Sequence, residues 1–152
     1  FRFNELQGYG HDMGAAMQTG VGGHAGLCGD AYSVAALMQM YLQGGYYNRI
    51  NLIKKSTIDS FNKSYYKKLY NRRGVGFDKP QLEGKHLSTF GDVSMNSFGH
   101  FGYTGTYAWA DPDKEIIIVI LANRTYPNDN FSFSENNVRT RIQEIVYKSI
   151  IN

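Results

Sequence analysis

The sequence is poor in the features that mark several protein classes. A single cysteine, Cys28, excludes an internal disulfide. No apolar run approaches the roughly 20 residues that a membrane-spanning helix needs, so we expect no transmembrane segment. No signal-peptide pattern is present either. The net charge is only +3, which gives no strong indication of a charged partner.

What the sequence does contain is typical of a globular domain. Hydrophobic residues make up 42% and charged residues 19% of the 152 residues, enough for one domain with a buried core. Aromatic residues are frequent, with twelve tyrosines. The sequence begins at Phe1 rather than at a methionine, so we expect a piece of a longer protein.

Two predicted strands and a tight turn lie between residues 106 and 121. Thr106 to Ala110 alternates, which places Tyr107 and Trp109 on one face of a strand. The next residues, Asp111-Pro112-Asp113-Lys114, have proline at the second position of a type I turn. Ile116 to Leu121 is an unbroken and mostly β-branched apolar run, which predicts a strand buried on both faces. The sequence therefore predicts an antiparallel hairpin in the middle of a sheet.

A glycine-rich segment precedes this hairpin. It reads His100-Phe101-Gly102-Tyr103-Thr104-Gly105, and glycines recur at positions 99, 102 and 105. Glycine at this spacing lets the backbone bend and lets another group approach it closely. The segment is a candidate for the lining of an active site.

These segments together resemble a known family. Residues 100–127 read HFGYTGTYAWADPDKEIIIVILANRTYP. This run is similar to the carboxy-terminal part of the serine β-lactamase and penicillin-binding-protein superfamily, in the branch of class C-like β-lactamases and their esterase and peptidase relatives. Two further pieces resemble the same family, namely His11-Asp12 and Gly23-His24-Ala25-Gly26-Leu27.

The resemblance implies a fold and a reaction. The expected fold is α+β, an antiparallel β-sheet with flanking helices, with residues 1–152 as the carboxy-terminal portion of a β-lactamase-like domain that lacks its nucleophile half. The implied function is part of a serine hydrolase that forms an acyl-serine intermediate on a small-molecule or peptide amide, ester or β-lactam, without a cofactor. Its implied location is the bacterial periplasm or cell envelope. A His-x-Gly motif in place of Lys-Thr-Gly points to an esterase- or peptidase-like enzyme.

The resemblance also implies roles for single residues. His100 takes the place of the third motif, Gly102 allows close substrate approach, and the backbone N–H of Tyr103 is the candidate oxyanion donor. Four residues are implied in substrate binding: Phe101, His24, Ala25 and Asn128. Structural alternatives exist, since His100 could simply bond a neighbouring carbonyl and His24 could tie a glycine loop together.

The nucleophile of this family stands in a Ser-x-x-Lys motif on an apolar helix. Ser60 and Ser64 both fit that pattern, but their surroundings are polar and both follow the helix that the family's nucleophile precedes. We therefore interpret both as chance matches. The isolated chain is then expected to be inactive, to pair with its missing amino-terminal half, or to self-associate through exposed sheet edge and apolar surface.

Several further elements follow from local patterns. Asp30 is a good N-cap for a helix to Gln43 with an apolar stripe. The other expectations are a short helix capped by Ser56, a strand at residues 74–77, a loop at residues 79–92, and a final helix capped by Ser134 with the stripe Val138, Ile142, Ile145, Val146 and Ile150. Residues 1–23 are expected to be mostly loop.

Other functions remain open at this stage. The fold could serve a non-catalytic binding domain. Residues 54–73 carry seven basic residues against one aspartate, as a polyanion-binding module would, but a solvated basic face explains them better and we expect no nucleic-acid partner. The four histidines lack close ligand spacing, so no structural zinc is expected. Cys28 is interpreted as a buried structural cysteine.

Overall fold

The computed structural model describes residues 7–81, 92–128 and 131–150. The chain divides into two compact units, Phe1–Asp30 and Ala31–Asn152. In the described residues of the first unit, one short helix, α1, spans Met13–Met17. We expected mostly loop here. Asp12 explains the helix, because its carboxylate accepts the N–H of Ala15 at 2.7 Å and so satisfies a free helix-end donor.

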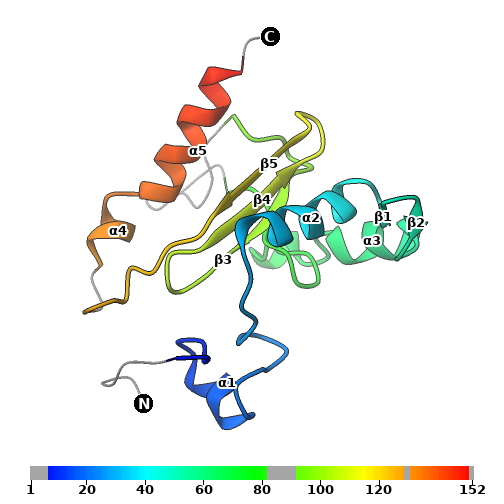
Figure 1. Cartoon of the computed structure of the whole chain (residues 1–152). Coiled ribbons are helices and arrows are strands. Elements are labelled where there is room, and N and C mark those ends of the chain that lie inside the picture. The colour runs from blue at the N-terminus through cyan, green and yellow to red at the C-terminus, as the bar shows by residue number, and fades with distance from the viewer. Residues whose placement is uncertain (1–6, 82–91, 129–130, 151–152) are drawn as a thin grey trace. The chain divides into compact units, whose positions relative to one another are not determined.

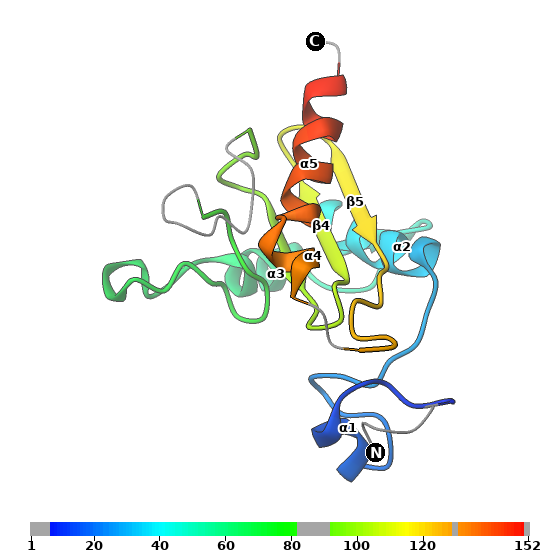
Figure 2. The ribbon, with the colours of Figure 1, turned by 90° about the vertical axis from the view of Figure 1, so that its left-hand side faces the viewer.

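The second unit is built on a three-stranded antiparallel sheet. Its strands are β3 (Phe98–Phe101), β4 (Tyr107–Asp111) and β5 (Ile116–Ile120), in the order β3-β4-β5. Helix α2 (Ala31–Leu42) covers one face of this sheet, and helix α5 (Val138–Ser149) covers the other (Figures 1 and 2). The expected α+β architecture, an antiparallel sheet with flanking helices, is confirmed.

The predicted hairpin is present, with one difference. Its register pairs Asp111 with Ile116, and the Asp111 carboxylate accepts the N–H of Asp113 at 3.1 Å and of Lys114 at 3.3 Å. This bonding is typical of aspartate at the start of a turn. Within the described sheet, however, β4 is central and β5 lies at the edge, so the expectation that the whole hairpin is central is wrong.

Alternation along the strands produces two apolar clusters. Tyr107, Trp109 and Ile118 face α5 and pack with its Tyr147, while Phe98 and Ala110 face α2 and pack with its Met38. Trp109 is 1% exposed. Each face of the sheet therefore has its own core, as a sheet between two helices requires.

Helix α2 follows its prediction closely. Asp30 directly precedes it, and the helix ends at Leu42, shortly before two glycines with positive φ, Gly44 and Gly45. The N–H of Gly45 bonds the carbonyl of Met40 at 2.9 Å, which closes the helix end. One member of the predicted stripe, Leu37, is 52% exposed.

Helix α5 differs from its prediction in both its start and its buried face. Ser134 lies in a separate short helix, α4 (Ser132–Glu135), and Asn137 with φ of +50° separates the two. The isoleucines of the predicted apolar stripe are exposed, including Ile145 at 66%, whereas its Val146 packs against the core. Gln143 and Tyr147 are buried instead, because each forms a hydrogen bond with a side chain of the sheet.

The remaining elements are short. Strands β1 (Tyr46–Tyr47) and β2 (Ile50–Asn51) form a small hairpin, α3 spans Lys55–Asn62, and a 3₁₀ turn spans Lys67–Leu69. The N-cap position of α3 is Lys54, so the expected Ser56 cap is wrong. Residues 74–77 form a bend rather than a strand, and only Asp78 bridges to β3, through Gly99. The expected loop at 79–92 falls mostly outside the described residues.

Within the parts of the chain that the structure describes, no helix combines the length and the apolar character needed to cross a membrane.

Candidate active site

The candidate site is the carboxyl end of β3 and the turn that follows it. His100 pairs with Ala108 in the register, which places it on the α2 face of the sheet, and its side chain is exposed. Its Nδ1 lies 3.0 Å from the carbonyl oxygen of Phe101, as the structural alternative predicted, and its Nε2 lies 3.4 Å from Nη1 of Arg73. His100 is therefore held by neighbours while its ring stays open to solvent.

Phe101, next along the strand, points to the opposite face. Its ring lies 5.0 Å from that of Tyr107 and 6.0 Å from that of Trp109, within the α5-facing cluster. The guanidinium of Arg139 stands 5.0 Å from the same ring. The contacts of Phe101 are thus core contacts, and its role in substrate binding stays a prediction.

The turn from Gly102 to Thr106 depends on its glycines. The N–H of Gly102 bonds the carbonyl of Thr106 at 2.9 Å, and that of Gly105 bonds the carbonyl of Gly102 at 3.1 Å. A Cβ on Gly102 would collide with the hydroxyl of Thr106, and Gly105 has φ of +100°. Both positions therefore exclude larger residues for local reasons, beside any need for close substrate approach.

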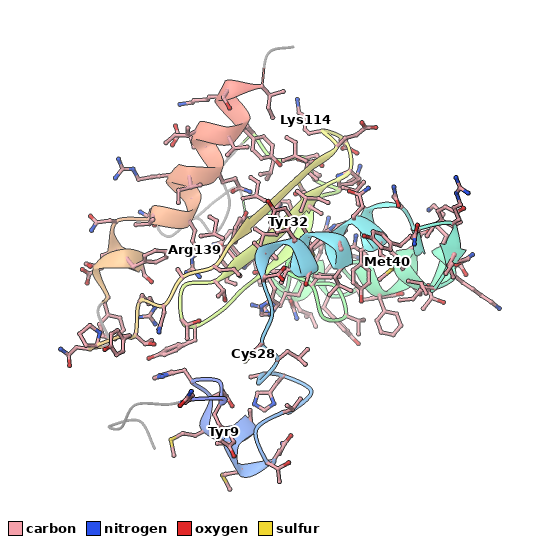
Figure 3. The ribbon with its side chains drawn as sticks, viewed as in Figure 1. Tyr9, Cys28, Tyr32, Met40, Lys114 and Arg139 are labelled. Carbon is pink, nitrogen blue, oxygen red and sulfur yellow. The ribbon has the colours of Figure 1, made fainter. Side chains whose placement is uncertain are left out.

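Two arginines hold this turn from outside. Arg139 on α5 points toward the sheet (Figure 3) and donates to the carbonyls of Gly102 at 3.1 Å and Thr106 at 3.3 Å. Arg124 donates to the carbonyl of Tyr103 at 2.7 Å and stacks on its ring, 4.5 Å from the centroid. Burial, and next the charge of Arg124, lower the pKa of Arg139. Every one of these contacts joins residues far apart in the sequence.

Sequence reasoning missed Arg139, although a signal was present. Arg139, Gln143 and Tyr147 recur every four residues, which marks one face of a helix. That face was overlooked because the neighbouring isoleucines gave the stronger apolar pattern.

Sequence reasoning also missed a second group of residues, a buried carboxylate and two arginines, one of which contacts His100. The carboxylate of Asp78 is buried, at 1% exposed, and pairs with Arg72 at 2.7 Å and with Arg73 at 3.7 Å. Because Arg73 also reaches His100, the bend at residues 72–78 is linked to the His-x-Gly motif.

Lys79 follows directly. Its Nζ donates to the carbonyl of Asn96 at 2.9 Å and lies 5.8 Å from the ring of Phe98. Burial, and next the nearby charge of Lys67, lower the pKa of Lys79 from 10.5 to about 8. This lysine beside β3 therefore loses its proton far more readily than an exposed one.

His24 and Ala25 belong to the first unit. The Nε2 of His24 lies 2.9 Å from Oδ1 of Asp12, the residue that caps α1. The bond from Ala15, and next that from His24, lower the pKa of Asp12. This pairing matches the reading of His24 as a residue that ties a glycine loop together. The expectation of a buried Cys28 is wrong, since this cysteine is exposed (Figure 3).

Asn128 is exposed and ends the segment that follows β5. That segment returns to the candidate turn, because the N–H of Arg124 bonds the carbonyl of Thr104 at 2.8 Å. The two serines of the chance Ser-x-x-Lys matches bond to backbone: Ser60 to the carbonyl of Ser56 and Ser64 to that of Arg72.

Metal ligands do not gather anywhere in the described part of the chain: residues 7–81, 92–128 and 131–150 contain no group of three His, Cys, Asp or Glu side chains placed to hold an ion.

Comparison with known proteins places the chain in a family. The family model described as "Beta-lactamase" matches residues 4–139. Two similar curated proteins, from Salmonella agona and Salmonella typhi, are each named "Putative D-alanyl-D-alanine carboxypeptidase" and are 36% identical to this chain over 127 residues. These 127 residues are 82% of this chain but only 29% of each relative. The chain therefore belongs to the beta-lactamase family, within the serine β-lactamase and penicillin-binding-protein superfamily.

Proposed function

We propose that this chain supplies the third active-site motif and the oxyanion strand of a serine hydrolase that works through an acyl-serine intermediate. The observation that carries the proposal is the His100–Tyr103 segment at the end of β3. An exposed imidazole is followed there by a glycine and a backbone N–H, in a turn that two arginines hold. Fixed N–H donors of this kind stabilise the oxyanion of acyl transfer.

The residues of the candidate site have these proposed roles. His100 contacts the substrate carboxylate or the serine hydroxyl, Gly102 leaves room for the substrate, and the N–H of Tyr103 donates to the oxyanion. Phe101 and Asn128 of the second unit and, separately, His24 and Ala25 of the first unit are proposed as substrate-binding residues. An acyl peptide is the favoured substrate class, because the relatives are named as carboxypeptidases and the motif is His-x-Gly.

The nucleophile is proposed to come from sequence outside these 152 residues. Neither Ser60 nor Ser64 lies on a buried apolar helix face, and both bond to carbonyls. Exposed surfaces of the second unit also support the proposal that the other half of the domain is missing from this chain. β5 is an edge strand of the described sheet, α5 exposes Ile142 and Ile145, and Ile150 directly after the helix is exposed as well. A strand with one open edge and exposed isoleucines favour association with that half or with a second copy. The proposed location is the bacterial cell envelope.

Covalent labelling tests the proposal. A fluorescent penicillin and a fluorophosphonate are applied to this chain and to the complete protein that contains it, and the adduct is mapped by peptide mass spectrometry. We expect labelling of the complete protein alone, on a serine outside residues 1–152. An adduct on Ser60 or Ser64 would show that the assignment of the nucleophile is wrong. Absence of labelling in both would favour a non-catalytic binding domain.

A further inference from the structure

The oxyanion donor and Arg139 meet at one peptide unit. The N–H of Tyr103 and the C=O of Gly102 belong to the same planar amide, so fixing one fixes the other. The carbonyl oxygen accepts from Nη1 of Arg139 at 3.1 Å. It also accepts the N–H of Gly105 at 3.1 Å, from within the turn. The orientation of the Tyr103 N–H is thus set by what its partner carbonyl binds.

The direction of this N–H follows from the trans peptide. The cis bond among the described residues is Tyr126–Pro127, so the Gly102–Tyr103 bond is trans and its C=O and N–H point in opposite directions. Arg139 reaches the carbonyl from α5. The N–H therefore points away from Arg139. His100 lies on the face of the sheet opposite α5.

The guanidinium of Arg139 is itself held in place. It also donates to the carbonyl of Thr106 at 3.3 Å, and it lies 5.0 Å from the ring of Phe101 and 5.8 Å from that of Phe133. These contacts involve the strand, the turn and α4, so the cation has little freedom to leave the carbonyl. A hydrogen bond from a cation is stronger than one from a neutral donor, and it polarises the amide that accepts it.

We propose that Arg139 is a positioning residue that fixes and polarises the Gly102–Tyr103 peptide unit, so that the N–H of Tyr103 is a stronger and better-aimed oxyanion donor. This inference rests on the proposed function. Arg124 acts on the next peptide unit, because it binds the carbonyl of Tyr103 at 2.7 Å. The two peptide units that flank the Tyr103 Cα are thus each held by an arginine.

The first part of the test uses this chain and needs no activity. The backbone ¹H and ¹⁵N shifts of Tyr103 are compared between the natural chain, Arg139→Gln and Arg141→Gln, an exposed arginine on the same helix. We expect Arg139→Gln to move the Tyr103 resonance and Arg141→Gln to leave it in place. Tyr103 shifts that are the same in Arg139→Gln as in Arg141→Gln would overturn the proposal. Arg139→Lys keeps the charge and covers the case in which the glutamine variant does not fold.

The second part uses the complete enzyme and a fluorescent penicillin. Removal of a whole oxyanion donor costs roughly 10²- to 10³-fold in rate, so weakening one is expected to lower the acylation rate constant about 10- to 100-fold. The dissociation constant of the non-covalent complex should stay unchanged, and Arg139→Lys should recover part of the rate. A merely structural role for Arg139 would not give this split.

The two failures are distinguishable. If the natural complete enzyme does not label, the proposed function fails, and the role of Arg139 in acylation fails with it. If the natural enzyme labels and Arg139→Gln labels at the same rate, only the role of Arg139 is overturned.

Discussion

Tyr147→Phe should destabilise the chain by removing one hydroxyl from the interface between α5 and the sheet. The hydroxyl of Tyr147 donates to Oδ2 of Asp111 at 2.7 Å, and the tyrosine is 8% exposed. Hydrogen bonds to charged groups contribute about 1.5–3 kcal/mol, so we expect a loss of about 2 kcal/mol in the free energy of unfolding at pH 7. Burial, and next the bond to Asp111, raise the pKa of Tyr147, so the hydroxyl keeps its proton throughout.

Urea unfolding followed by tryptophan fluorescence measures this loss. The chain has one tryptophan, Trp109, which is buried on β4 beside the altered contact. The matched control is Tyr70→Phe, because Tyr70 is fully exposed and its hydroxyl should contribute less than about 0.5 kcal/mol. A double-mutant cycle with Asp111→Asn isolates the pair.

The effect should depend on pH with a definite sign. Burial alone would raise the pKa of Asp111, but bonds from Ser94, Tyr147 and Lys114 outweigh it and hold the pKa below 3.8. A carboxylate with a lowered folded-state pKa stabilises the chain above 3.8, and this contribution is lost as the pH falls through the folded-state value. The difference in the free energy of unfolding between the natural chain and Tyr147→Phe should therefore become smaller in strong acid. Equal unfolding free energies for Tyr147→Phe and Tyr70→Phe at pH 7 would refute the reasoning.

Two further predictions concern the surroundings of the candidate site. Lys79→Met should raise the free energy of unfolding at pH 7 by about 1 kcal/mol, a value discounted for the partial exposure of the lysine. Because the folded-state pKa of Lys79 is about 8 and its ordinary value is 10.5, the unfolded chain binds more protons between these values. The free energy of unfolding of the natural chain should thus rise from pH 8 to pH 10, so that the advantage of Lys79→Met disappears over that interval. Urea unfolding at several pH values measures this difference. A difference that stays constant with pH would contradict the burial of the charge. Gly105→Ala should cost about 1–2 kcal/mol, because φ is +100° there and a Cβ would press on Ala122 and Phe133 at 3.3 Å. Gly29→Ala, where a Cβ meets no atom within 4 Å, is its control, and equal melting temperatures would count against the strain.

Local patterns in the sequence predict the elements that local forces determine. The β4–β5 hairpin follows from alternation, a proline at the second turn position and a β-branched run, and the end of helix α2 follows from two glycines. In each case the deciding contacts lie within a few residues along the chain. The candidate site residues 100–103 were proposed through the resemblance, since a glycine-rich segment alone assigns them no roles.

Long-range contacts decide the parts that sequence reasoning missed. Apolar periodicity placed Val146 of α5 correctly against the core but missed Gln143 and Tyr147, because these two find hydrogen-bond partners on the sheet that no local pattern reveals. The same reason explains Arg139, whose hydrogen-bond acceptors lie more than thirty residues away. The expected strand at 74–77 failed because Gly76 has φ of +107° and the chain bends there.

The most direct test of the central claim is the acylation rate of the complete protein with His100→Gln, measured with a fluorescent penicillin. Arg141→Gln serves as the exposed control. If the His100–Tyr103 segment is the third active-site motif, His100→Gln should slow acylation by at least about tenfold while the melting temperature stays within a few degrees, since a positioned proton-handling group typically contributes 10²- to 10⁴-fold. Equal acylation rates for His100→Gln, Arg141→Gln and the natural protein would contradict the assignment of this segment to the active site.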